Sequence, residues 1–299
     1  MTVVALPELL REARRDGYAV GYFESWDVYS LEAVVAAAEA ERSPVIIGIG
    51  GLTADHAWLR ERGIELYGAV AATLGRRAAV PAAVIYNEAD SLNEATVALG
   101  AGYNAVMMVS QGLPWDELIS DTAALTTAAH RAGVAVEGEF DELAEMRDGE
   151  LHDAGSRLTD AGRAADFVQR TDVDCLAVSV GSVHFVTGGH VPTIEVDLIR
   201  ALTRAVEVPL VLHGGSGVPP DQLRAAVAAG IAKVNVATRL KQAFGAGLRG
   251  ALDQDGEDPN LAYGSRLHGD VMSAGAQAVC AEARRYMQLL GSSGKAVRR

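Results

Sequence analysis

Short β-rich runs alternate with longer amphipathic segments along the chain, and this alternation constrains the fold more than any other sequence feature. The β-rich runs are residues 19–23, 44–50, 81–86, 105–109, 134–140, 175–180, 208–213 and 233–237. Segments with helical spacing are residues 30–42, 92–101, 122–132, 160–169, 196–205 and 220–229. Several β-rich runs are apolar throughout, as strands buried on both faces are. Eight β–α units in about 250 residues predict a closed (β/α)₈ TIM barrel, with a doubly wound open sheet as the alternative.

The chain contains no linker rich in Pro, Gly or Ser, so residues 1–299 are predicted to form a single TIM-barrel domain. Residues 255–299 are expected to be a C-terminal helical appendage, with an amphipathic helix at 271–290. Residues 141–157 are charged, nonperiodic and too long for an ordinary loop between strand and helix. Such a loop lies over the active-site face of a barrel, so it is either a lid or an exposed loop without a role.

The charge of the chain disfavours two classes of partner. With 26 basic and 39 acidic residues, the net charge of −13 repels nucleic acid and anionic membranes. A phosphorylated metabolite remains possible, since backbone N–H groups or a metal can hold an anion locally. We find no membrane-spanning run and no signal-peptide layout. Cys175 and Cys280 are too few for a disulfide framework and are expected to be buried thiols in a cytoplasmic protein.

Reactive side chains gather where the predicted strands end, which is the active-site face of a barrel. His184 and His213 end two consecutive strands, and Glu88 and Glu139 stand at the ends of two others. Two imidazoles and a carboxylate at one rim predict a divalent-metal site suited to zinc, manganese or iron. The alternative is that each histidine is a hydrogen-bonded core residue.

A glycine-rich turn follows the seventh predicted strand. Its residues Gly214, Gly215 and Ser216 would expose backbone N–H groups to an anion, although such turns often serve packing only. Asn235 and Thr238 follow the eighth strand, and barrels commonly build a phosphate site from the seventh and eighth loops. Together these residues predict phosphate binding.

The sequence resembles class II fructose-bisphosphate aldolases and their ketose-bisphosphate relatives. The matching segments are 136–139, 176–184, 208–217, 230–238 and 290–296, in order and with compatible spacing. The chain is identified as a divergent member of this family. The resemblance implies a barrel in which a divalent metal, usually zinc, polarises a ketose phosphate, and an enzyme that forms a homodimer or homotetramer.

The resemblance also implies a role for each candidate residue. His184 and His213 would be metal ligands, and Glu139 would be a ligand or an acid/base group. The phosphate would be held by Gly214, Gly215, Ser216 and Thr238, and Asn235 would contact the ketone end. Removing a proton next to a ketone creates an enediolate, which a metal bound to its oxygens stabilises.

The chain departs from the family at the acid/base position. Asn87 and Glu88 stand where relatives carry an Asp-His pair. Glu88 would complete a set of two histidines and one carboxylate, whereas Asn87 cannot exchange protons. The acid/base group would then be Glu24, Glu139 or an acid of the predicted lid; the lid acids are Asp148 and Glu150.

Further departures indicate an altered substrate. Trp26 and Phe185 are bulkier than the usual family residues, Arg239 stands in place of an acidic residue, and Thr187-Gly188 replaces a Tyr-Lys pair. These changes predict a singly phosphorylated or smaller substrate in place of fructose bisphosphate. The leading hypothesis is a metal-dependent aldolase, a carbon–carbon lyase of carbohydrate metabolism. The alternatives are a sugar phosphate isomerase or epimerase, or a non-catalytic partner subunit.

Overall fold

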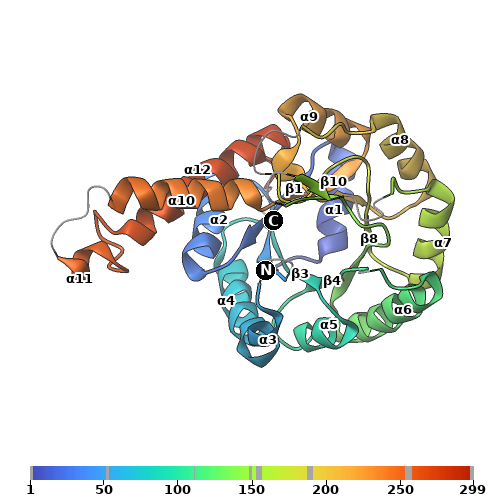
Figure 1. Ribbon diagram of the computed structural model, residues 1–299, viewed down its shortest axis with the longest axis horizontal. Helices are drawn as coiled ribbons and strands as arrows, with labels where there is room; N and C mark the ends of the chain where they lie inside the picture. Colours follow the sequence, from blue (N-terminus) through green and yellow to red (C-terminus); the bar gives the residue numbers. More distant parts are fainter. Residues whose placement is uncertain are drawn as a thin grey trace.

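The computed structural model describes residues 3–51, 54–110, 112–147, 150–152, 157–186, 191–252 and 258–296. Within these residues, eight strands close into a barrel, which confirms the predicted fold and excludes the open sheet (Figure 1). The strands are β1 (Val20–Ser25), β2 (Val45–Gly50), β3 (Ala82–Ala89), β4 (Ala105–Met108), β5 (Ala135–Gly138), β8 (Cys175–Ala177), β9 (Leu210–Leu212) and β10 (Ile231–Val236). All neighbouring barrel strands pair in parallel, so their carboxyl ends share one face.

Helices surround the strands (Figure 1). They are α1 (Leu6–Asp16), α2 (Val28–Glu41), α3 (His56–Trp58), α4 (Ile64–Arg77), α5 (Leu92–Ala98), α6 (Trp115–Ala132), α7 (Ala161–Thr171), α8 (Val196–Ala205), α9 (Pro220–Ala229), α10 (Thr238–Leu252), α11 (Pro259–Ala262) and α12 (Val271–Leu289). The predicted helical segments correspond to α2, α5–α9 and α12, whereas α1, α4 and α10 were not predicted. In the part of the chain that the structure describes, no helix is long and apolar enough to cross a membrane.

The apolar core has two layers. Inward-facing residues such as Ile46, Ile85 and Met107 fill the barrel, and α1 adds Leu6 and Leu10 to the same cluster. Outward-facing residues pack against the surrounding helices in a second cluster. Just before α1, the Val4 N–H donates to the Ala82 carbonyl at the start of β3, so α1 closes the amino end of the barrel. Polar side chains gather at the opposite, carboxyl end.

The C-terminal helix α12 projects from one side of the barrel together with α10 and α11 (Figure 1). Helix α12 packs along α10 and α2, and its Tyr286 donates a hydrogen bond from the hydroxyl to the Ser216 carbonyl oxygen at 3.3 Å. Beyond the helix, Ser292 accepts a hydrogen bond from Ser43 at 2.8 Å between the hydroxyl oxygens. The end of the chain therefore supports the loop that follows β9.

Part of the predicted lid forms regular structure. Strands β6 (Glu145–Arg147) and β7 (Glu150–His152) pair antiparallel, whereas the sequence indicated only a nonperiodic loop; Asp148 lies outside the described residues. In β6, the Met146 N–H donates to the His184 carbonyl at 3.0 Å, and the His184 N–H donates to the carbonyl of Ala144, just before β6, at 2.9 Å. The hairpin thus fixes the backbone of a candidate metal ligand.

Candidate functional site

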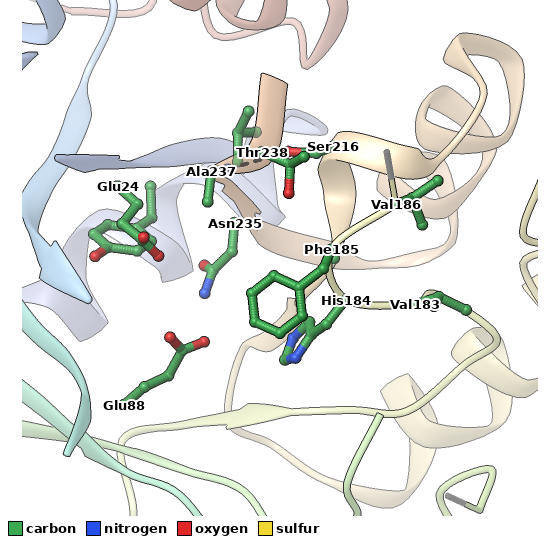
Figure 2. A pocket seen from close by; sticks show the side chains of 13 residues that line it. Glu24, Glu88, Val183, His184, Phe185, Val186, Ser216, Asn235, Ala237 and Thr238 are labelled. Carbon is green, nitrogen blue, oxygen red and sulfur yellow. Dashed lines mark hydrogen bonds between the residues drawn. The ribbon is translucent and has the colours of Figure 1, made fainter. Parts of the chain in front are cut away.

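A pocket lies at the carboxyl end of the barrel, between β1, β3, β10 and the loops after β8 and β9. Figure 2 shows Glu24, Glu88, His184 and Asn235 around a common space. The lining residues are Tyr22, Glu24, Glu88, Val183, His184, Phe185, Val186, Gly214, Ser216, Asn235, Val236, Ala237 and Thr238. Of the remaining predicted site residues, Asn87, Glu139, His213 and Gly215 are buried outside this lining. Most of the predicted residues therefore converge on one site.

Three of these side chains form a group with metal-binding geometry. The ligand atoms of Glu88, His184 and His213 all lie within 4.8 Å of one another. The two histidine rings are nearly parallel, with centroids 5.9 Å apart. Burial, with a smaller contribution from His213, lowers the pKa of His184 to about 3, so the ring is neutral, as a metal ligand must be.

The buried Nδ1 atom of His213 has no hydrogen-bond partner among the described residues. A buried nitrogen without a partner costs free energy that a metal ion would recover. The donor set of two imidazoles and one carboxylate suits zinc, manganese or iron. The residues present therefore fit a divalent metal.

Behind His213 lies a buried ion pair that orients its ring. Glu137 accepts a hydrogen bond from His213 Nε2 at 2.9 Å and another from Lys233 Nζ at 2.6 Å. Burial alone would raise the pKa of Glu137, but Lys233 and His213 bring it down to about 2. An ionised Glu137 keeps the proton of His213 on Nε2 and leaves the Nδ1 lone pair for a metal.

Sequence reasoning assigned no role to Glu137 or Lys233. The signal that could have found them is a charged residue inside an apolar strand run, because such a residue is almost never buried without a partner. Their side chains have no exposed surface. Neither residue on its own indicates which partner it meets.

Two of the three carboxylates at the site have no lysine or arginine beside them among the described residues. Glu24 pairs with Lys241, whose Nζ lies 3.3 Å from Glu24 Oε1. Among the described residues, Glu88 and Glu139 have no lysine or arginine within 4.0 Å. Burial, followed by the neighbouring Glu24, raises the pKa of Glu88 well above its usual range, and burial raises that of Glu139 to about 8. A divalent cation between them would let both carboxylates ionise.

A backbone turn brings Glu88 into the pocket. Along β3, Ile85 faces the barrel interior and Tyr86 faces the helices, so a regular strand would point Asn87 inward and Glu88 outward. Glu88 instead has a φ of +63°, in the left-handed region. Phe185, next to His184, also has a positive φ of +57°. Residues with such strained backbone conformations persist only where the surrounding structure enforces them, and they are common at functional sites.

The predicted phosphate loop has a geometry that favours an anion. Gly214 has a φ of +68°, and a Cβ there would come within 2.6 Å of the backbone of the loop after β8. Ser216 Oγ accepts hydrogen bonds from the N–H groups of Ala237 and Arg239. The Arg239 side chain donates back to the Ser216 carbonyl at 3.3 Å. The start of α10 at Thr238 and the Arg239 guanidinium both place positive charge beside Ser216.

Several predicted roles change once the geometry is known. Trp26 packs edge-on against Phe244 of α10, with centroids 5.4 Å apart, and does not line the pocket, so it does not narrow it. Phe185 does line the pocket. Glu24, at the end of β1, is paired with Lys241 in the first turn of α10.

The remaining acid/base candidates also separate. Asn87 is fully buried, and its amide has no partner among the described residues. Glu150 of β7 is exposed and lies outside the pocket lining, so it is no acid/base candidate in this arrangement. The pair Thr187-Gly188, where the sequence departs from the family pattern, lies outside the described residues.

Comparisons with known proteins show which family this chain resembles. The model of the family "Fructose-bisphosphate aldolase class-II" matches residues 4–295. The chain is 33% identical to a fructose-bisphosphate aldolase of Geobacillus stearothermophilus, over 99% of each chain. It is 32% identical to a 6-phospho-5-dehydro-2-deoxy-D-gluconate aldolase of Bacillus velezensis, over 100% of this chain and 99% of that protein. The solved YdjI aldolase of Escherichia coli K12 has a TM-score of 0.82 at 26% identity, covering 99% of this chain and 100% of that one.

Proposed function

This chain belongs to the class II fructose-bisphosphate aldolase family, and we propose which of its residues carry the reaction and which substrate it takes. The family match over nearly the whole chain identifies a metal-dependent aldolase, a carbon–carbon lyase, over the isomerase and the non-catalytic subunit. The observation that carries the residue assignment is the convergence of Glu88, His184 and His213, together with a His213 Nδ1 atom that has no hydrogen-bond partner among the residues the structure describes.

Glu88, His184 and His213 would hold the divalent metal, with zinc as the first candidate and manganese or iron as alternatives. A bound metal would supply a Lewis acid for the substrate's keto oxygen. Glu137 orients His213, and the β6–β7 hairpin holds the His184 backbone. Glu139, whose Oε2 lies 3.5 Å from His213 Nδ1, would add a carboxylate next to the ligands.

The loop after β9 and the start of α10 would hold the substrate phosphate. Gly214, Gly215, Ser216 and Thr238 supply the loop and helix end, and Arg239 adds a positive charge. Asn235 lines the same pocket, and its amide has no partner in the described part of the chain. We assign this amide to the ketone end of the substrate.

Aldol cleavage requires a base that takes the proton from a substrate hydroxyl. Asn87 cannot serve because an amide does not accept a proton at ordinary pH. Glu24 carries a carboxylate on the pocket wall, at the end of β1 and on the same face as Glu88 and His184. We therefore assign proton removal to Glu24. Lys241 balances its charge.

We propose a ketose phosphate with a single phosphate as the substrate. The relative from Bacillus velezensis is named for a substrate with one phosphate, next to its keto carbon. In this chain, a second hollow of about 410 Å³ shares Phe185 and Thr238 with the pocket, and Lys241 and Arg249 also line it. That hollow would receive the end of the substrate that lies away from the phosphate loop.

The purified enzyme should release dihydroxyacetone phosphate from a panel of ketose phosphates, and a chelator should stop the release. We expect fructose bisphosphate to be cleaved slowly, because the Phe185 ring lines both the pocket and the hollow and would leave less room for a second phosphate. Phe185→Gly removes the ring and suits the positive φ, so kcat/KM for fructose bisphosphate should rise about 10-fold. Phe185→Leu keeps the bulk and serves as the control. Efficient cleavage of fructose bisphosphate by the unaltered enzyme would contradict the proposed substrate.

We further propose a cytoplasmic homodimer or homotetramer, and both cysteines are free thiols, as that compartment favours. Helices α10–α12 form a projecting arm (Figure 1). Four exposed apolar side chains lie on this arm. They are Leu252, Leu261, Tyr263 and Leu267, with exposed fractions of 44–61%. A second copy covering them would explain this surface. Light scattering should report an oligomer that Leu267→Glu weakens and the control Leu66→Glu, on α4, does not. A monomer at micromolar concentration would refute this proposal.

A further inference from the structure

Tyr22 carries a buried hydroxyl that no interaction within the described residues explains. Its side chain has no exposed surface, yet it lines the pocket, and its hydroxyl has no hydrogen-bond partner among those residues. Leaving a buried hydroxyl without a partner costs about 1–3 kcal/mol. A group of this kind on a pocket wall calls for a ligand atom to accept its hydrogen bond.

The position of Tyr22 places it among the groups assigned to the substrate. In β1 it lies two residues before Glu24, so the two side chains share one face of the strand. In the neighbouring strand β10 its register partner is Asn235. Tyr22 and Asn235 therefore stand side by side toward the carboxyl end of the barrel, and within the described part of the chain neither side chain has a hydrogen-bond partner for its polar atoms.

The surroundings keep the phenol a donor. Burial raises its pKa well above the usual value, and the carboxylates of Glu24 and Glu88 add to the effect. The Lys233 ammonium lies 5.1 Å from the ring centroid and is taken up by its ion pair with Glu137. A neutral phenol beside these carboxylates can give a hydrogen bond but cannot act as the base.

We propose that the Tyr22 hydroxyl donates a hydrogen bond to the keto oxygen of the ketose phosphate as negative charge develops on that oxygen. The proposal rests on the proposed function and adds a catalytic residue to it. A donor already in place, in a site that excludes water, stabilises such charge without reorganisation. Asn235 would complete the polar contacts at the same end of the substrate, and Glu24 would remain the group that takes the hydroxyl proton in cleavage.

Tyr22→Phe removes only the hydroxyl and keeps the ring that packs against Lys233. The probe reaction is exchange of solvent deuterium into dihydroxyacetone phosphate, which reports proton removal next to the ketone without the full substrate. We expect the exchange rate at saturation to fall about 10²- to 10³-fold, with little change in KM, because the bond strengthens only as charge develops. Metal content should not change, and the melting temperature should not fall, because the variant removes a buried hydroxyl that has no partner among the described residues.

Tyr103→Phe is the matched control. Tyr103 is a second buried tyrosine, and its hydroxyl donates to the Ile64 carbonyl at 3.2 Å, away from the pocket. Its exchange rate should equal that of the unaltered enzyme. A second readout is calorimetric binding of a phosphorylated hydroxamate, whose planar O–N–C–O group resembles an enediolate. Tyr22→Phe should weaken this binding and leave the binding of inorganic phosphate unchanged.

The outcomes distinguish a failure of the proposed role of Tyr22 from a failure of the proposed function. Unchanged exchange in Tyr22→Phe, or a rise in KM alone, overturns the role of Tyr22 in stabilising developing charge. If the unaltered, metal-loaded enzyme neither exchanges deuterium nor binds the hydroxamate, the proposed function itself fails. Slower exchange with weaker hydroxamate binding and normal metal content supports the role of Tyr22.

Discussion

Replacing His213 with alanine is expected to remove the bound metal and to lower aldol cleavage more than about 10³-fold. Glu137, itself paired with Lys233, holds His213, one of the proposed ligands, from its Nε2 side. Glu88 and His184 alone leave too few donors for a tight site. Metal analysis of the purified protein and the cleavage assay measure both effects.

The substitution also leaves a Glu137 oxygen without its partner inside the barrel, so folding has to be checked separately. Glu88→Gln keeps the volume and the interior network, and it should weaken metal binding while the melting temperature changes little. His130→Ala is the control, because His130 lies at the end of α6 and pairs with Asp174, far from the pocket. Equal, near-stoichiometric metal in His213→Ala and His130→Ala would exclude His213 as a ligand.

Glu24→Gln should lower kcat by about 10²- to 10⁴-fold while the metal stays bound. Glutamine has the size of glutamate but takes no proton, so the loss reports the base. Glu150→Gln is the matched control, since Glu150 is exposed on β7 and tests an acid of the predicted lid. Full turnover in Glu24→Gln, with normal metal content, would show that another group removes the proton.

Asn87→Asp tests the position where relatives carry an acidic residue. Asn87 is fully buried and outside the pocket lining. An aspartate there would bury another carboxylate beside Glu88, so we expect lower stability and no gain in cleavage. Faster cleavage of ordinary ketose phosphates by this variant would mean that the asparagine alone separates this enzyme from its relatives.

The proposed metal ligands could be grouped from the sequence because a barrel brings the ends of neighbouring strands together. His184 and His213 each end a β-rich run, and parallel strands bring those ends to one face. The same reasoning placed Ser216 and Thr238 together. It also suggested Glu88, although regular strand alternation would have turned that side chain toward the helices, and the left-handed φ that corrects this is not visible in the residue order.

The groups around the ligands could not be found in the same way. Glu137 and Lys233 are 96 residues apart, and each alone is only a charge in an apolar run. The partner of Glu24 depended on which turn of α10 passes β1, and α10 was not predicted. The contact of Trp26 with Phe244 likewise required the position of that helix.

The sequence by itself determined the barrel, the face that carries the site and the ligand types, because periodicity and strand-end chemistry are local properties of the chain. The tertiary structure decided which charges are paired, which polar groups stay unpartnered and which side chains reach the pocket. Those outcomes depend on burial and on distances between elements far apart in the chain. Tyr22 illustrates the difference: its residue type fits any apolar strand, and only the closed barrel places its hydroxyl on the pocket wall without a partner among the described residues.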